Sequence, residues 1–180
     1  SDATLLLQEI LDRGLTDNIS GLYWDPMAIR LCKEAGLGSQ LTLRIGGKCC
    51  RESGLPIDLD VTVEGIIENA VQPFGSVTQP IGDAVWLRAA GNVNLVLNSL
   101  RGQTFHPDAF GQFGPFGMEL SSLKIIIPKS SQHFYAGFAP IATEVIYATS
   151  PGTLNTDFGT IGFTKLKTPF WPNVEDPYDS

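Results

Sequence analysis

The sequence predicts a mixed α/β fold: a βαβ-type sheet flanked by helices, with an antiparallel β-rich insertion at about residues 55–100. Three observations support this fold class. Strand, helix and strand patterns follow one another in residues 18–45, a similar succession is expected in residues 123–149, and strand-like segments separated by turns fill the middle. The 180 residues suffice for one substantial core, so we expect residues 1–180 to form a single domain.

The chain begins with an amphipathic segment, SDATLLLQEIL, which predicts a helix. Asp2 is the expected N-cap of this helix, and Gly14 is its expected end. Residues 18–24 (NISGLYW) follow as an apolar run that is typical of a buried strand.

A second helix is predicted to begin at Asp25 and Pro26. An aspartate accepts hydrogen bonds from the first free amides of a helix, and the fixed φ of proline suits the first turn. Residues 40–45 (QLTLRI) then alternate as a half-buried strand. We expect the strands at 18–24 and 40–45 to be parallel members of a right-handed βαβ unit.

The middle of the chain reads as antiparallel β structure. A hairpin is expected around Gly91 and Asn92, and residues 72–83 (QPFGSVTQPIGD) are expected to form a long loop. The strand-like segments are 57–67, 84–90 and 93–99.

The last third predicts a second strand–helix–strand succession. Residues 106–114 suggest one or two helical turns, and residues 123–128 (LKIIIP) a central strand. Residues 130–142 are expected to form a helix with a serine cap, followed by a buried strand at 143–149 (TEVIYAT). We expect the segment from Ser150 onward to wrap the surface.

The composition excludes several classes of protein. A net charge of −7 and scattered basic residues disfavour nucleic acid as a partner, because phosphate binding needs clustered Lys and Arg. No apolar run reaches the ~18 residues of a membrane span, and no secretory signal is visible.

Three cysteines, Cys32, Cys49 and Cys50, make a poor disulfide framework and indicate a reducing cytoplasm. Two small thiols are a plainer interpretation of Cys49-Cys50 than a redox pair.

Two predicted strand ends carry candidate binding residues. Ligands of α/β sheets bind beyond the carboxyl ends of strands and at helix N-termini, where Asp25 and Lys129-Ser130-Ser131 are expected. Lysine, hydroxyls and free amides together would suit a carboxylate or phosphate, although a serine cap beside a solvated lysine is the plainer interpretation. His133, on the expected first turn, is a weak candidate for proton transfer.

Other chemistry finds little support. Lys48, in the Gly-Gly-Lys stretch after the strand at 40–45, could approach a phosphate, but a bend into the β-rich insertion is the plainer interpretation. His106 is the only histidine besides His133, and no His or Cys pair has zinc-ligand spacing. No Gly-x-Ser-x-Gly motif supports a catalytic triad. We therefore expect no metal ligands and no complete catalytic group in this chain.

Several stretches together resemble the C-terminal domain of the MlrC-like family of bacterial zinc metallopeptidases, named after a microcystin-degrading enzyme. In order, these are SDATLLLQEILDRG, GLYWDPMAIRLCKEAGLG, LRIGGK, PKSSQHFYAGFAPIATEVIYATSPG and KTPFWP, and they extend to about residue 172. Family members often carry arginine where Tyr135 stands here. The resemblance implies zinc ligands in a separate N-terminal domain, which would be the partner of this one, and a small peptide-like substrate.

The resemblance further implies that Lys129 to His133 face the zinc domain, contributing to substrate binding or to the domain interface. This chain alone would then be inactive, because metal-activated water needs ligands that it lacks. A free-standing module that binds small anions at the Lys129–Ser131 helix terminus is the alternative. A domain that only supports folding or homo-oligomerisation of its parent is a third option.

Overall fold

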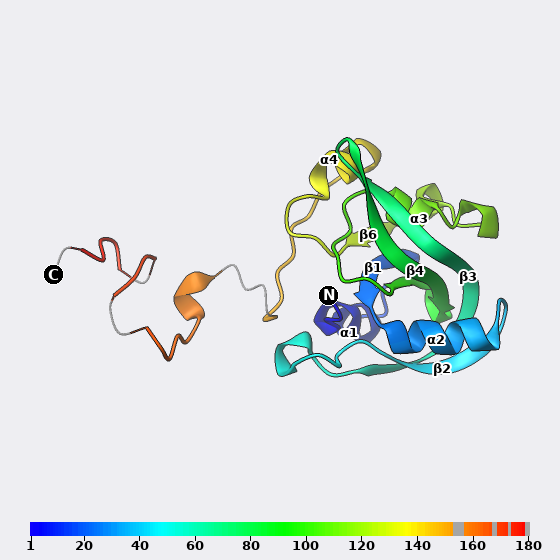
Figure 1. Cartoon of the computed structure of the whole chain (residues 1–180), viewed down its shortest axis with the longest axis horizontal. Coiled ribbons are helices and arrows are strands. Elements are labelled where there is room, and N and C mark those ends of the chain that lie inside the picture. The colour runs from blue at the N-terminus through cyan, green and yellow to red at the C-terminus, as the bar shows by residue number, and fades with distance from the viewer. Residues whose placement is uncertain (153–156, 167–168, 173, 179–180) are drawn as a thin grey trace.

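The computed structural model describes residues 1–152, 157–166, 169–172 and 174–178. Its centre is a six-stranded mixed sheet with the strand order β2-β3-β4-β5-β1-β6 (Figure 1). Neighbouring strands are antiparallel from β2 to β5, whereas β1 is parallel to both β5 and β6. The strands are β1 (Asn18–Trp24), β2 (Gln40–Ile45), β3 (Ile57–Phe74), β4 (Val77–Ala89), β5 (Val93–Asn98) and β6 (Ile125–Pro128).

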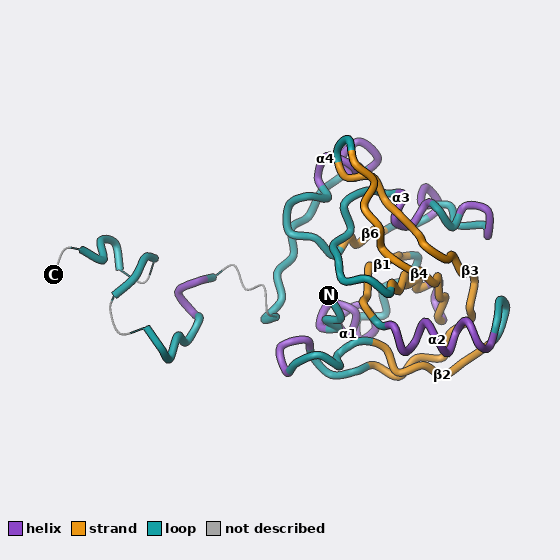
Figure 2. Tube along the Cα trace, viewed as in Figure 1, coloured by secondary structure: helices purple, strands orange, loops and turns teal. Residues whose placement is uncertain are grey.

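The helices are few and short. The described α-helices are α1 (Leu5–Asp12), α2 (Pro26–Ala35), α3 (Asp108–Gly111) and α4 (Tyr135–Phe138). Single 3₁₀ turns lie at Arg51–Ser53, Ala90–Asn92, Gly114–Phe116, Leu120–Ser122, Ala139–Ile141 and Phe158–Thr160. Figure 2 shows how the long β3 and β4 strands bend past the helices.

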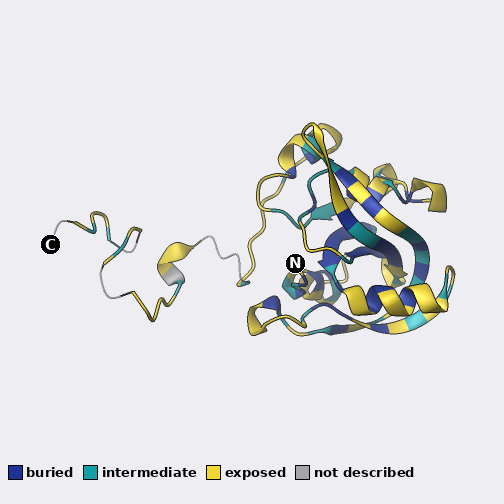
Figure 3. Ribbon diagram, in the orientation of Figure 1, coloured by how far each residue is buried: buried dark blue, intermediate teal, exposed yellow. Residues whose placement is uncertain are grey.

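Each face of the sheet has its own apolar core, because successive side chains of a strand point to opposite faces. Along β5, Leu95 and Leu97 pack with side chains of α1 and α2, whereas Val96 packs with Phe110 of α3 and Phe138 of α4. These side chains are buried. The ribbon of the central strands is mostly coloured as buried, whereas the outer side of α2 is exposed (Figure 3). The two cores hold the strands whose ends form the candidate site.

The mixed α/β fold class is confirmed, and the strands at 18–24 and 40–45 and the hairpin at Gly91-Asn92 lie where they were predicted. The direct βαβ pairing is wrong. β2 pairs with β3 at the far edge of the sheet and, through the antiparallel ladders, runs opposite to β1. Strand β1 is instead paired in parallel with β5 on one side and with β6 on the other. The chain crosses from β5 to β6 through α3.

Four local predictions also differ from the structure. Residues 72–83 belong to the β3–β4 hairpin rather than to a long loop, and β6 is an edge strand rather than a central one. Residues 143–149 are not a strand, and Ile146 and Tyr147 in this segment are exposed. The described residues from 157 onward lie apart from the sheet in Figure 1 rather than wrapping it.

Candidate functional site

The carboxyl ends of three parallel strands meet at one edge of the sheet. β5 ends at Asn98, which pairs with Trp24 at the end of β1, and β6 ends at Pro128, which pairs with Gly21 of β1. The backbone amide of Asp25 donates a hydrogen bond to the Asn98 carbonyl at 3.2 Å. This edge, where open α/β sheets bind ligands, is the candidate site.

Asp25 is buried at this edge and joins three parts of the chain. Its Oδ1 accepts from the amide of Ala28 at 3.1 Å, which confirms the predicted N-cap of α2. Its Oδ2 accepts from the amide of Gly46 at 2.9 Å and from Nζ of Lys48 at 2.7 Å. The structure thus brings Asp25 and Lys48 together, but as partners of each other. Lys48 also donates to the Arg44 carbonyl at 2.6 Å, so its ammonium group stabilises the loop at 46–48.

Asp2 does not cap α1, contrary to the prediction. Helix α1 begins at Leu5 with Thr4 before it, and Asp2 is buried against the loop after β2. One carboxylate oxygen of Asp2 accepts from the amides of Lys48 and Cys49, both at 2.8 Å, and the other accepts from Ser53 Oγ at 2.9 Å. Burial raises the pKa of Asp2, but hydrogen bonds from Ser53, Cys49 and the backbone outweigh it and lower the pKa to about 2.

Lys129 is the first residue after β6, and its side chain folds back under the N-terminal segment. Nζ donates to the Ala3 carbonyl and lies 3.8 Å from the centroid of the Tyr23 ring. Burial lowers the pKa of Lys129 to about 7, although the charge of Asp2 acts in the opposite direction. Lys129 is therefore a half-buried amine at the candidate site, as its predicted position after a strand suggested.

The serines after Lys129 do not cap a helix. Ser130 Oγ donates to Gln103 Oε1 at 2.9 Å, Ser131 is exposed, and α4 begins only at Tyr135 with no side-chain cap. The helix N-terminus expected at Lys129–Ser131 is therefore absent, and with it the geometry on which the anion-binding alternative depended.

His133 is exposed and lies near the tip of the β3–β4 hairpin. Its ring meets the edges of Phe74 and Phe105, with centroid separations of 5.3 and 5.7 Å. The sequence placed His133 beside Lys129, but the two side chains have different neighbours, since Lys129 reaches Ala3 and Tyr23. In the described structure, His133 has an aromatic rather than a charged environment.

Sequence reasoning did not single out Arg101, which lies at the same edge. The Arg101 guanidinium is 4.4 Å from the centroid of the Trp24 ring, and it donates to Cys49 Sγ at 3.0 Å. A signal was available: Arg101 closely follows the predicted strand at 93–99, just as Asp25 and Lys129 follow theirs. We missed it because a single arginine in a turn is normally solvated.

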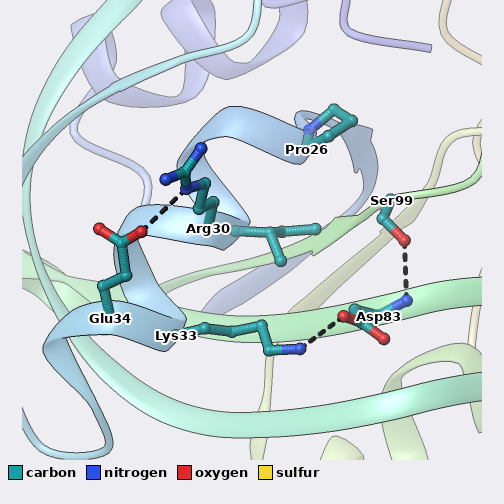
Figure 4. Close-up of a pocket in the computed structure, with 7 residues that line it drawn as sticks. Pro26, Arg30, Lys33, Glu34, Asp83 and Ser99 are labelled. Carbon is teal, nitrogen blue, oxygen red and sulfur yellow. Dashed lines mark hydrogen bonds and ion pairs between the residues drawn. The ribbon is translucent and has the colours of Figure 1, made fainter.

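A shallow depression of about 400 Å³ lies beside this edge (Figure 4). Lys33 Nζ contacts Asp83 at 2.7 Å and Glu68 at 2.8 Å, and Arg30 pairs with Glu34 at 2.8 Å. Because its charged groups already neutralise one another, we do not assign a ligand to it. The depression is lined by Pro26, Ile29, Arg30, Lys33, Glu34, Asp83 and Ser99, so none of the predicted site residues contributes to it.

The described residues contain no group of three or more His, Cys, Asp or Glu side chains that could hold a metal ion. The side chains at the candidate edge therefore do not fit a zinc ion, and no chemical step through a metal can be derived from them. None of the helices in the described part of the chain has the length and apolar character required to cross a bilayer.

Comparisons with known proteins identify relatives of this chain and its family. Microcystinase C from Sphingomonas sp. is 32% identical over 171 residues, which cover 95% of this chain and 32% of that protein. The chain therefore spans about a third of the length of this relative. A crystal structure described as "Putative metallopeptidase" from Mesorhizobium sp. BNC1 has the same fold, with a TM-score of 0.68 and 21% identity over 78% of this chain and 28% of that one. The family model described as MlrC C-terminus matches residues 1–165. The chain therefore belongs to the MlrC C-terminus family.

Proposed function

We propose that this chain is the C-terminal domain of a zinc-dependent peptidase or amide hydrolase of the MlrC type, acting on a small peptide-like substrate. The observation that carries the proposal is the 32% identity to Microcystinase C over nearly the whole chain, together with the two thirds of that relative for which this chain has no counterpart. In this proposal the zinc ligands belong to the preceding part of a longer polypeptide.

The geometry of the candidate edge supports a contact with that preceding part. Asp2 is bound by the loop after β2, Ala3 is bound by Lys129, and the Ser1 carbonyl accepts from the Trp24 amide at 3.2 Å. A polypeptide that precedes Ser1 would therefore leave the domain from the carboxyl edge of the parallel strands. The candidate residues would lie beside the junction of the two parts.

The role proposed for this domain is to bind and orient substrate or to form the interface, not to activate water. Lys129 can donate a hydrogen bond or present a positive charge at the junction, and Lys48 and Asp25 hold the loop that shapes it. His133, with Phe74 and Phe105, offers an aromatic surface with one titratable ring. The metal-bound hydroxide that such enzymes use would come from the other domain.

The test uses the full-length parent protein. Metal analysis of this protein is expected to show zinc, and hydrolysis of a panel of linear and cyclic peptides is expected to be lost when the zinc is removed. Substitutions Lys129→Met and His133→Ala are expected to raise KM or lower kcat without changing the zinc content.

The matched control is Lys124→Met, because Lys124 is an exposed lysine that pairs with Asp17 at 2.7 Å just before the same strand, β6. If both site variants behave like this control in kinetics and in thermal stability, the proposed role of Lys129 and His133 is wrong. If the full-length protein holds no zinc and cleaves no peptide, the proposed enzyme class is wrong.

A further inference from the structure

Arg101 is held in an unusual position at the candidate edge. Its guanidinium lies 4.4 Å from the centroid of the Trp24 ring, and the indole N–H of Trp24 is itself fixed by donating to the Ser99 carbonyl at 2.9 Å. The Sγ atom of Cys49 accepts a hydrogen bond from one nitrogen of Arg101 at 3.0 Å. Stacking and hydrogen bonding thus fix the orientation of an exposed side chain that would otherwise move freely.

Arg101 has no counter-charge among the residues that the structure describes. The ion pairs formed there engage Arg13, Arg30, Arg44 and Arg88, but none includes Arg101. Burial and the adjacent Asp2 carboxylate raise the pKa of the Cys49 thiol, so Cys49 is a neutral partner at pH 7. Of the five N–H donors of the Arg101 guanidinium, the described residues accept a hydrogen bond from one, at Cys49 Sγ.

The position of Arg101 is that of a ligand-binding group. It follows the carboxyl end of β5, Trp24 ends β1 and Lys129 follows β6, so a guanidinium, an indole ring and a half-buried amine follow the carboxyl ends of the three parallel strands. An arginine that stacks on an aromatic ring presents a planar fork of donors, which matches the two oxygens of a carboxylate.

We propose that Arg101, positioned by Trp24 and Cys49, binds a carboxylate group of the peptide-like substrate. The inference rests on the proposed function, and it adds a specificity that the proposed function does not contain: preference for an acidic peptide, through its C-terminus or an acidic side chain. Trp24 and Cys49 act as positioning residues. An acidic side chain of the preceding domain is the competing partner, and the experiment below distinguishes it from a substrate carboxylate.

The experiment measures binding to the metal-free full-length protein, so that no hydrolysis occurs. The probes are a tripeptide with a free C-terminal carboxylate and the same tripeptide as its amide, together with a second pair in which an internal Glu replaces Gln. Isothermal titration calorimetry gives Kd for each probe. Arg101→Gln is expected to raise Kd for one or both acidic probes about 10- to 100-fold, the usual effect of losing a hydrogen bond to a charged group. Kd for the matched neutral probes is expected to change by less than about twofold.

Two further variants sharpen the result. Arg101→Lys is expected to give an intermediate loss, because an ammonium keeps the charge but not the planar fork. Arg13→Gln is the control, since Arg13 is exposed on the surface of the same domain and pairs with Glu9 at 2.8 Å. This variant should change no Kd.

The proposal is overturned if acidic and neutral probes lose affinity equally, or if neither pair is affected by Arg101→Gln. A fall in thermal stability of the full-length protein without loss of acid preference would assign Arg101 to the domain interface instead. The proposed function fails separately, through absence of zinc and of peptide hydrolysis, so the two failures can be told apart.

Discussion

Substitution of Asp25 by alanine is expected to be one of the most destabilising single changes at the candidate edge. Asp25 is 2% exposed, and its carboxylate accepts three hydrogen bonds. Loss of the N-cap to Ala28 costs about 1 kcal/mol. The buried amide of Gly46 would lose its partner, which costs about 1–3 kcal/mol. The pair with Lys48 adds only about 0.5–1 kcal/mol, because the lysine side chain is 37% exposed. We therefore expect a total loss of about 3–4 kcal/mol in the free energy of unfolding.

Urea unfolding at pH 7, followed by circular dichroism, measures this loss as a shift in midpoint at constant slope. The matched control is Asp58→Ala, which breaks a pair with Arg44 in which both side chains are more than half exposed. That change should cost less than about 1 kcal/mol. Lys48→Met isolates the ionic part and should cost about as little as the control. If Asp25→Ala were no more destabilising than Asp58→Ala, the reasoning from buried hydrogen bonds would be refuted.

Three further predictions concern the same edge. Because the pKa of Asp2 is lowered from 3.8 to about 2, its stabilising effect is complete above pH ~4 and is lost as the pH falls toward 2. The free energy of unfolding, measured by urea titration, should therefore fall between pH 5 and pH 2.5, and Asp2→Asn should reduce this fall by about 1–2 kcal/mol. The Lys129 amine should titrate with a midpoint of about 7 in an NMR titration of the lysine side chains, a resonance that Lys129→Met deletes; a midpoint near 10 would contradict its burial. Gly46→Ala should lower the free energy of unfolding by about 2 kcal/mol or more beyond the effect of Gly14→Ala. Both glycines have a positive φ, but of the two only Gly46 would place a Cβ against backbone, 2.5 Å from the Asp2 carbonyl oxygen. Equal losses of stability in thermal unfolding would refute this prediction.

Local patterns were good predictors where the interactions are local. The Asp25-Pro26 pair predicted the start of α2 because the cap joins residues three apart, and the strands at 18–24 and 40–45 were recognisable from their own side chains. Strand order was not predictable in this way. The strand at 40–45 pairs with β3 rather than with β1, and this choice depends on which sheet edge the long β3–β4 hairpin leaves open.

The two wrong cap predictions have a common physical origin, which is competition from partners far away in sequence. Ser130 is well suited to cap a helix, yet its hydroxyl donates to Gln103, 27 residues earlier. Asp2 is equally well suited, yet its carboxylate is taken by amides and a hydroxyl 46 to 51 residues later. A cap contributes only about 1 kcal/mol, so two or three buried hydrogen bonds to a charged oxygen outweigh it.

The same competition explains which charged side chains at the candidate edge are paired with one another. Asp25 and Asp2 both bind the loop at 46–49: Asp25 pairs with the Lys48 ammonium, and Asp2 accepts from the Lys48 backbone amide. At this edge the Lys129 amine donates to a backbone carbonyl and the Arg101 guanidinium lies on an indole, and neither forms an ion pair with a described carboxylate. A site that pairs its carboxylates and leaves an exposed arginine without one is suited to receive a negative group from outside the domain.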